Sequence, residues 1–140
     1  MILLDTNVIS EIMRIRPEPV VSAWLDSQPE EELWTSSIVI AELLSGIDLM
    51  PVSPKQRALR EAVEDMIAQD FGGRILKFDM NAARHYGEIF SHRQQIGRPI
   101  KQMDGLILAT AKAHGATLAT RNIPDFEHCG VPLVNPWQAV

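Results

Sequence analysis

Five oxygen-bearing side chains stand where predicted secondary-structure elements begin or end. Asp5 follows the first apolar run, Glu42 lies within an apolar helix, and Asp104 lies near the start of another helix. Asn122 and Asp125 follow a later apolar run. Carboxylates held together repel by about 1 to 4 kcal/mol per pair at 4 Å, depending on the effective dielectric. If the fold gathers these side chains, the cluster requires a cation or shared protons.

The elements that would position these residues are short apolar runs alternating with amphipathic stretches. Apolar runs at 2–4, 33–35, 74–78, 117–119 and 132–134 predict buried strands. Between them, helices are predicted at about 8–13, 17–27, 37–50, 54–69, 80–97 and 101–114. Strands separated by helices indicate an α/β fold with a parallel sheet covered on both faces. Ligands of such sheets lie outside the carboxyl ends of the strands, where these acids would meet.

An all-oxygen site of this kind favours a hard cation, so Mg²⁺ or Mn²⁺ is the predicted cofactor. One such ion can lower the pKa of a bound water while another offsets charge on a leaving oxygen, which suits phosphodiester hydrolysis. The sequence has no Gly-x-Ser-x-Gly elbow, phosphate-binding glycine loop or His-Glu-x-x-His helix. Acyl transfer, nucleotide hydrolysis and zinc proteolysis are therefore disfavoured.

The length and net charge of the chain limit the number of domains and the partners that it can have. The 140 residues suffice for one core, so we expect a single domain spanning 1–140. Thirteen Lys and Arg stand against 18 Asp and Glu, a net charge of −5 that disfavours nucleic-acid binding over the whole surface. Cys129 is the single cysteine, and no apolar run reaches the roughly 20 residues of a membrane span. We expect a cytoplasmic protein without a membrane partner.

Basic residues near the acids predict local phosphate contacts instead. Arg98 and Lys101 precede Asp104, and Arg121 lies between Thr120 and Asn122. These side chains are candidate RNA-binding residues beside the acidic site. Further basic residues nearby that could extend such a track are Arg14, Arg16 and Arg93.

Four blocks of the sequence, in order, resemble the signature blocks of PIN-domain ribonucleases. They are Met1–Glu11, Ile40–Leu43, Met103–Ala111 and Leu118–Phe126. The closing Val134–Trp137 resembles the FitB-like branch of the VapC toxins in that family. A single block is a weak signal, but four in order at family spacing are highly specific.

The resemblance implies a compact three-layer α/β/α fold with a central parallel sheet of about five strands. It also implies a Mg²⁺- or Mn²⁺-dependent endoribonuclease, the toxin of a type II toxin-antitoxin pair. Such a toxin is held in check by a small antitoxin, and DNA is contacted only through that antitoxin. A homodimer and a toxin-antitoxin hetero-oligomer are the implied assemblies.

The resemblance also implies roles for individual residues. The metal ligands carry over to Asp5, Glu42 and Asp104. Many members have Asp where this chain has Asn122, and Asp125 either takes that place or assists through water, which leaves a second metal open. Polar positions that line the family's site, as groups supporting the ligands or contacting phosphate, match Thr6, Asn7, Ser36 and Thr120.

Simpler structural roles compete with several of these assignments. Asp5 and Asp125 could cap a helix or turn, and Glu11 could pair with Arg14 three residues later. A receiver-like phospho-accepting module is disfavoured because Asp5 has no acidic neighbour. The alternative function is a catalytically weak PIN-like binding or regulatory module that acts through an antitoxin partner and DNA.

Overall fold

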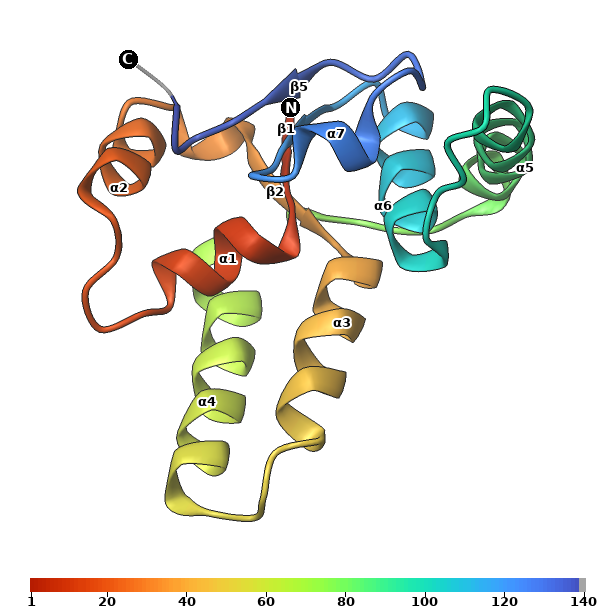
Figure 1. Cartoon of the computed structure of the whole chain (residues 1–140). Helices are drawn as coiled ribbons and strands as arrows, with labels where there is room; N and C mark the ends of the chain where they lie inside the picture. The colour runs from red at the N-terminus through yellow and green to blue at the C-terminus, as the bar shows by residue number, and fades with distance from the viewer. Residues whose placement is uncertain (139–140) are drawn as a thin grey trace.

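The computed structural model describes residues 1–138, so Ala139 and Val140 of the predicted domain lie outside the described residues. Five parallel strands form one sheet in the order β3-β2-β1-β4-β5 (Figure 1). This confirms the predicted α/β class and parallel sheet. The strands are β1 (Ile2–Leu4), β2 (Leu33–Ser36), β3 (Ile75–Leu76), β4 (Thr117–Ala119) and β5 (Leu133–Val134).

Helices flank this sheet on both sides. Figure 1 shows α5 and α6 on one side of the strands and α1, α2 and α4 on the other, which confirms the three-layer arrangement. The helices are α1 (Thr6–Ile12), α2 (Pro19–Asp26), α3 (Ser37–Asp48), α4 (Pro54–Asp65), α5 (Met80–Gln95), α6 (Gln102–Ala113) and α7 (Ile123–Phe126). A 3-10 turn at Glu30–Glu32 precedes β2, and a π-helical turn at Met66–Phe71 continues α4.

The register of the sheet aligns the ends of its three central strands. Leu4 lies opposite Ala119, and Leu3 lies opposite Trp34. Continuing this register, Asp5, Ser36 and Thr120 lie at the same level, at the carboxyl ends of β1, β2 and β4. The chain runs outward from β1 in both directions, which makes this edge the topological switch point where ligands of open α/β sheets bind.

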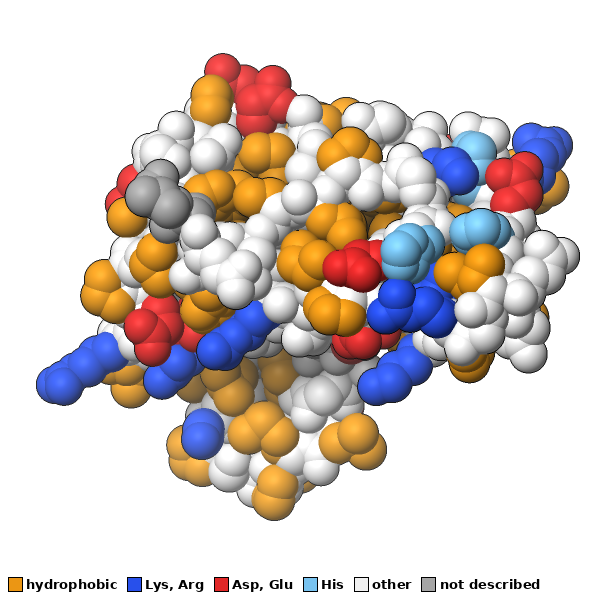
Figure 2. Space-filling model, turned by 45° about the horizontal axis from the view of Figure 1, so that its top comes forward, with side chains coloured by type: hydrophobic (Ala, Val, Ile, Leu, Met, Phe, Trp, Pro, Cys, Tyr) orange, Lys and Arg blue, Asp and Glu red, His pale blue; other side chains and the backbone are white. Residues whose placement is uncertain are grey.

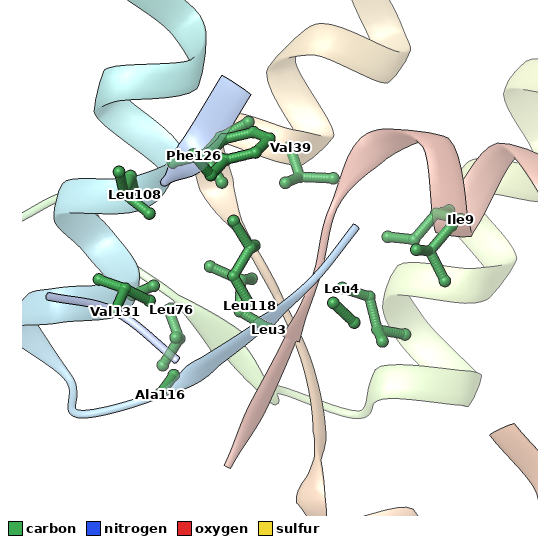
Figure 3. Close-up of a cluster of buried hydrophobic side chains, with 14 of the residues drawn as sticks. Leu3, Leu4, Ile9, Val39, Leu76, Leu108, Ala116, Leu118, Phe126 and Val131 are labelled. Carbon is green, nitrogen blue, oxygen red and sulfur yellow. The ribbon is translucent and has the colours of Figure 1, made fainter. Parts of the chain in front are cut away.

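The hydrophobic core explains why these strands read as continuous apolar runs. Leu3, Leu4 and Leu118 are fully buried, and helix residues such as Leu108 and Phe126 close over them (Figure 3). A parallel strand covered on both faces has no solvent-facing side, so its sequence does not alternate. The first polar side chain after each run therefore marks the edge of the sheet.

Helix caps fix the elements that carry the acids. Ser36 Oγ accepts a hydrogen bond from Val39 N at 3.1 Å, which fixes the start of α3 as predicted. Gly105, beside Asp104 on α6, lies where a Cβ would come within 2.9 Å of the Tyr86 ring of α5. Only glycine allows α5 and α6 to approach this closely at the start of α6.

Two predicted elements differ in extent from the structure. The strand predicted at 74–78 is confined to Ile75–Leu76, because β3 is an edge strand that pairs with β2 alone. The helix predicted to end near residue 69 continues as the π-helical turn to Phe71 and stops at Gly72, whose φ is +53°. The single turn of α7 was not predicted, because four residues leave no periodicity to detect.

Among residues 1–138, none of the helices has both the length and the apolar composition that crossing a bilayer requires.

Candidate active site

A cavity of about 860 Å³ opens at the carboxyl ends of the central strands. The structure brings five predicted residues from four separate parts of the chain into its wall. They are Asp5 after β1, Glu42 on α3, Asp104 on α6, Asn122 before α7 and Asp125 within α7. The switch point of the sheet and the acidic cavity are thus the same place.

Asp5 is a buried carboxylate that hydrogen bonds hold in one orientation. It accepts from the backbone N–H of Thr6 at 2.8 Å and from Thr120 Oγ1 at 2.8 Å. Burial raises the pKa of Asp5, the Thr120 and Thr6 hydrogen bonds oppose that rise, and the charges of Glu42 and Asp125 add to it. The side chain caps α1 and lines the cavity, so the two roles considered for it are compatible.

Thr120 and Asn7 tie the ends of β1 and β4 together around Asp5. Besides donating to Asp5, Thr120 Oγ1 accepts from Asn122 N at 3.1 Å and from Asn7 Nδ2 at 3.3 Å. Asn7 Oδ1 accepts from Arg121 N at 3.3 Å. Thr120 is fully buried, so its hydroxyl acts on Asp5 and the Asn122 backbone rather than on a ligand in the cavity.

Glu42 reaches the cavity from the second turn of α3. One of its carboxylate oxygens accepts a hydrogen bond from the Thr6 hydroxyl. Ser36 is fully buried, and its hydroxyl accepts from Val39 N at the start of α3. Ser36 therefore does not line the cavity. It influences Glu42 by fixing the start of α3, the helix that carries Glu42.

The raised pKa of Asp104 reflects the burial and the negative charge of the cavity. Burial, followed by the negative charges of Asp5, Asp125 and Glu42, raises the pKa of Asp104 to about 6, while Lys101 opposes the rise. The ordinary pKa of an aspartate is 3.8. Asp5, Asp125 and Glu42 are thus close enough to Asp104 to disfavour its charged form, and a bound cation would relieve that repulsion.

The donor set of the cavity suits a hard divalent cation, because its acids and Asn122 offer oxygen ligands. Across residues 1–138, however, no three His, Cys, Asp or Glu side chains are arranged so that they could hold a metal ion. Glu42, for example, is engaged by the Thr6 hydroxyl. Chemistry and charge fit a metal, whereas coordination requires the carboxylates to rotate toward one point.

Further residues that the resemblance did not assign also line the cavity. The Glu11 carboxylate is buried and pairs with Arg14 at 3.0 Å, which confirms the pairing expected from their spacing. The Trp137 ring lies 5.1 Å from the Arg121 guanidinium carbon. No local pattern marks Trp137 for this place, because β5 and the segment after it bring it back to the sheet edge. The others are Ser10, Arg14, Gln102 and Met103.

The predicted basic residues divide into three groups. Arg14, Lys101 and Arg121 line the cavity, and Arg16 lies outside that lining. Arg98 lies outside its lining, with Nη1 at 2.9 Å from His128 Nε2 and 3.9 Å from Glu127 Oε2. Arg93 was suggested as part of a phosphate track, which is wrong because only 4% of it is exposed.

Comparison with known proteins shows where this arrangement belongs. The sequence profile of the PIN domain matches residues 2–128. This chain belongs to the PIN domain family. The predicted resemblance to VapC-type toxins and their FitB-like branch is confirmed by full-length relatives.

One such relative is the plasmid stability protein StbB of Pseudomonas syringae pv. tomato, 44% identical over 99% of this chain and 100% of its own length. Toxin FitB of Neisseria gonorrhoeae is 45% identical over 98% of this chain and 99% of its own. VapC ribonuclease Y4jK of Sinorhizobium fredii is 40% identical over 99% of both. The structure of FitAB bound to an IR36 DNA fragment superimposes with a TM-score of 0.91 over 100% of this PIN-domain chain and 98% of the other, at 44% identity.

Proposed function

We propose that this PIN-domain chain is a metal-dependent endoribonuclease toxin of a type II toxin-antitoxin pair. The observation that carries the proposal is the convergence of Asp5, Glu42, Asp104 and Asp125 on one cavity, where their charges act on one another. Similar proteins of the same length are named VapC ribonuclease and Toxin FitB, which supports an RNA substrate and a toxin role.

Asp5, Glu42 and Asp104 are the proposed ligands of Mg²⁺ or Mn²⁺. When bound, the ion lowers the pKa of water for attack on phosphorus and offsets negative charge on the phosphodiester. Asn122 offers a neutral oxygen and Asp125 a carboxylate in the same cavity, where they complete the site or hold a second ion. Thr6, attached to Asp5 by its N–H and to Glu42 by its hydroxyl, fixes the spacing of two ligands.

The RNA backbone is proposed to pass over Lys101 and Arg121, the cavity's basic residues next to Asp104 and Asn122. Arg98 would meet the same strand farther along. Asn7 and Thr120 keep the two strand ends in register beneath it. A net charge of −5 makes this basic contact local, so we expect weak RNA affinity before the acids are neutralised by metal.

Purified protein incubated with RNA tests the enzymatic proposal. We expect cleavage in Mn²⁺ or Mg²⁺, none in EDTA, and products with 5′-phosphate and 3′-hydroxyl ends mapped by end-specific ligation. A rise in melting temperature with Mn²⁺ accompanied by no cleavage would contradict the enzyme and support the alternative binding module instead.

An apolar groove next to the cavity is the proposed site for the antitoxin. It has a volume of about 1000 Å³, lies among α1, α3 and α4, and shares Thr6, Ser10, Arg14 and Glu42 with the acidic cavity. In the space-filling view, hydrophobic side chains lie at the surface of the projecting part built by α3 and α4 (Figure 2). The groove's apolar lining is Met13, Ile15, Leu43, Ile47, Met50, Ala58, Leu59 and Val63.

The helices predicted at 17–27 and 54–69 both have apolar residues that a partner chain could contact. Residues of α4 line the groove, whereas none from α2 does. Solved relatives include FitAB and the VapBC2 complex of Rickettsia felis bound to a promoter DNA fragment. We therefore propose that a small antitoxin occupies the groove and alone contacts DNA, and that two such toxins pair in a homodimer within the hetero-oligomer.

Expression of the chain alone and together with a small candidate antitoxin protein tests the partner. Alone, the chain is expected to arrest growth and generate new RNA ends; with the antitoxin, growth recovers and the two proteins copurify. Normal growth and unchanged RNA ends on expression alone would contradict the toxin assignment.

A further inference from the structure

Arg93 is a buried cation with no role in the proposed chemistry. It lies near the C-terminal end of α5, where only 4% of it is exposed. The ion pairs found within residues 1–138 do not include it. Burying a charge is costly unless hydrogen bonds replace its hydration. The hydrogen-bond partners of this guanidinium therefore indicate its role in the structure.

All the partners of Arg93 lie in two segments that deliver residues to the cavity. Nε donates to the carbonyl oxygen of Arg98 at 2.6 Å, in the loop before Lys101 and Asp104. Nη1 donates to the carbonyl oxygens of Asp125 at 2.9 Å and Glu127 at 3.2 Å. Cys129 Sγ lies 3.9 Å from the same nitrogen.

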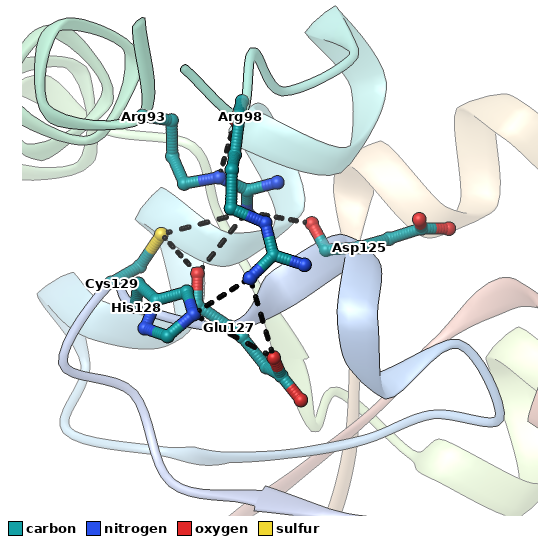
Figure 4. Close-up of polar contacts among 6 residues, drawn as sticks. All are labelled: Arg93, Arg98, Asp125, Glu127, His128 and Cys129. Carbon is teal, nitrogen blue, oxygen red and sulfur yellow. Dashed lines mark hydrogen bonds and ion pairs between the residues drawn. The ribbon is translucent and has the colours of Figure 1, made fainter. Parts of the chain in front are cut away.

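Figure 4 shows the consequence for Asp125. Its backbone carbonyl faces the Arg93 guanidinium, while its carboxylate points the opposite way. Arg93, on α5, therefore donates a hydrogen bond to the backbone of Asp125, the residue whose carboxylate lines the cavity. Neutral carbonyls are its partners, so Arg93 orients this turn without adding a competing carboxylate.

The turn that Arg93 contacts is short, and its other buried anchor is the Phe126 side chain. α7 is a single turn, and after it His128 has φ +67° and Gly130 has φ +74°, values that residues other than glycine rarely adopt. The exposed contact between Arg98 and His128 joins the same two segments at the surface. Arg93 is the buried tie, and its planar fork can reach several carbonyls at once, which a lysine ammonium on a single stem cannot do in the same geometry.

We propose that Arg93 is a positioning residue that fixes Asp125 in the wall of the cavity by anchoring the α7 turn to the loop before α6. The inference rests on the proposed metal-dependent function, and it assigns that function a residue outside the cavity. Groups that orient metal ligands from outside typically change metal affinity or activity by about 10- to 100-fold when altered.

The test is Mn²⁺ binding by titration calorimetry on the full chain, together with cleavage kinetics. Arg93→Lys is expected to weaken Mn²⁺ binding and lower kcat by about tenfold each, with KM for RNA within about twofold of the parent. KM is spared because Arg93 is buried and does not meet RNA. The matched control is Arg84→Lys, an exposed arginine on the same helix, which is expected to leave both measurements unchanged.

Asp125→Asn separates positioning from a general structural effect. If Arg93 acts through Asp125, adding Arg93→Lys to Asp125→Asn changes Mn²⁺ affinity by less than about threefold, because the group being positioned has lost its charge. An equal tenfold loss in both backgrounds would overturn the proposal. Arg93→Gln, which keeps N–H donors without the charge, is measured in parallel in case the lysine variant does not fold.

The outcomes also distinguish this inference from the proposed function. No Mn²⁺ binding by the parent would refute the metal-dependent function itself. Mn²⁺ binding by the parent that is matched within twofold by folded Arg93→Lys and Arg93→Gln would refute the positioning role alone.

Discussion

Asp5→Asn is expected to lower Mn²⁺-dependent RNA cleavage by at least about 100-fold, because a proposed ligand loses its charge at the centre of the site. That loss should exceed the roughly 10- to 100-fold effects typical of residues that only support a ligand. Steady-state cleavage of a defined RNA measures it, with Mn²⁺ binding followed separately by calorimetry.

The fold should survive this substitution. The new amide oxygen can still accept from Thr6 N and so keep the cap of α1, while a buried charge is removed. The altered contacts are at the other carboxylate oxygen, which accepts from Thr120 Oγ1 at 2.8 Å and from Asn7 Nδ2 at 3.3 Å. A net hydrogen bond contributes about 0.5 to 1.5 kcal/mol, so we expect a melting temperature within a few degrees of the parent.

Asp65→Asn is the matched control, since Asp65 is exposed at the end of α4 and undergoes the same chemical change far from the cavity. It should cleave RNA at the parental rate. Cleavage by Asp5→Asn within tenfold of the parent, in protein that remains folded, would remove Asp5 from the ligand set.

The acids of the site were predictable from the sequence because a local signal and a topological rule coincide. Asp5 ends an apolar run, and a parallel sheet brings such ends to one edge. Glu42 and Asp104 lie one and a half turns or less from the start of helices at that edge. The structure places all three in one cavity.

The supporting contacts were not predictable in the same way. Arg93 meets Asp125 and Glu127 across more than 30 residues of sequence, and nothing in the composition of α5 identifies which arginine turns inward. Trp137 reaches Arg121 through the path of the C-terminal segment. Such contacts depend on tertiary packing, whereas periodicity reports only which face of an element is apolar.

Element boundaries also divide into those that the sequence predicts and those that depend on tertiary packing. The starts of α3 and α5 follow from Ser36 and Asp79, whose side chains accept from backbone N–H groups three residues later. The π-helical turn after α4 has no comparable signal, because it extends the same amphipathic pattern until Gly72 adopts a positive φ. A helix cap is a local feature that can be recognised in the sequence, whereas a change of helical pitch depends on tertiary packing.

Asp104→Asn is expected to abolish most activity and yet stabilise the metal-free protein, two effects of opposite sign. As a lost ligand it should lower cleavage by at least about 100-fold, for the reason given for Asp5. As a lost charge it should relieve the repulsion from Asp5, Asp125 and Glu42 that raises the pKa of Asp104 to about 6.

The pH dependence fixes the sign of the stability effect. The folded pKa of about 6 lies above the ordinary value of 3.8, so between these values the folded state binds the proton more tightly than the unfolded state. The favourable contribution of neutral Asp104 is complete below pH 3.8 and is lost as the pH rises through 6. Asparagine keeps the neutral form at every pH.

Thermal unfolding in EDTA should therefore show parent and Asp104→Asn close together at pH 4 and separated at pH 8, with the variant more stable. Allowing for solvent screening of a half-buried group, we expect about 1 kcal/mol, or about 3 °C in Tm. Asp65→Asn again serves as the control and should show no such divergence.

Adding Mn²⁺ at pH 8 should reverse the order of the two proteins. The parent gains stability because the ion binds only the folded state, whereas the variant lacks one carboxylate of the site. A variant less stable than the parent in EDTA at pH 8 would show that Asp104 is held by favourable contacts instead of strained by its neighbours. Equal stabilisation of both proteins by Mn²⁺ would place the ion elsewhere. The crossing of the two curves thus tests, in one protein and without RNA, whether the acidity of this cavity exists to bind a cation.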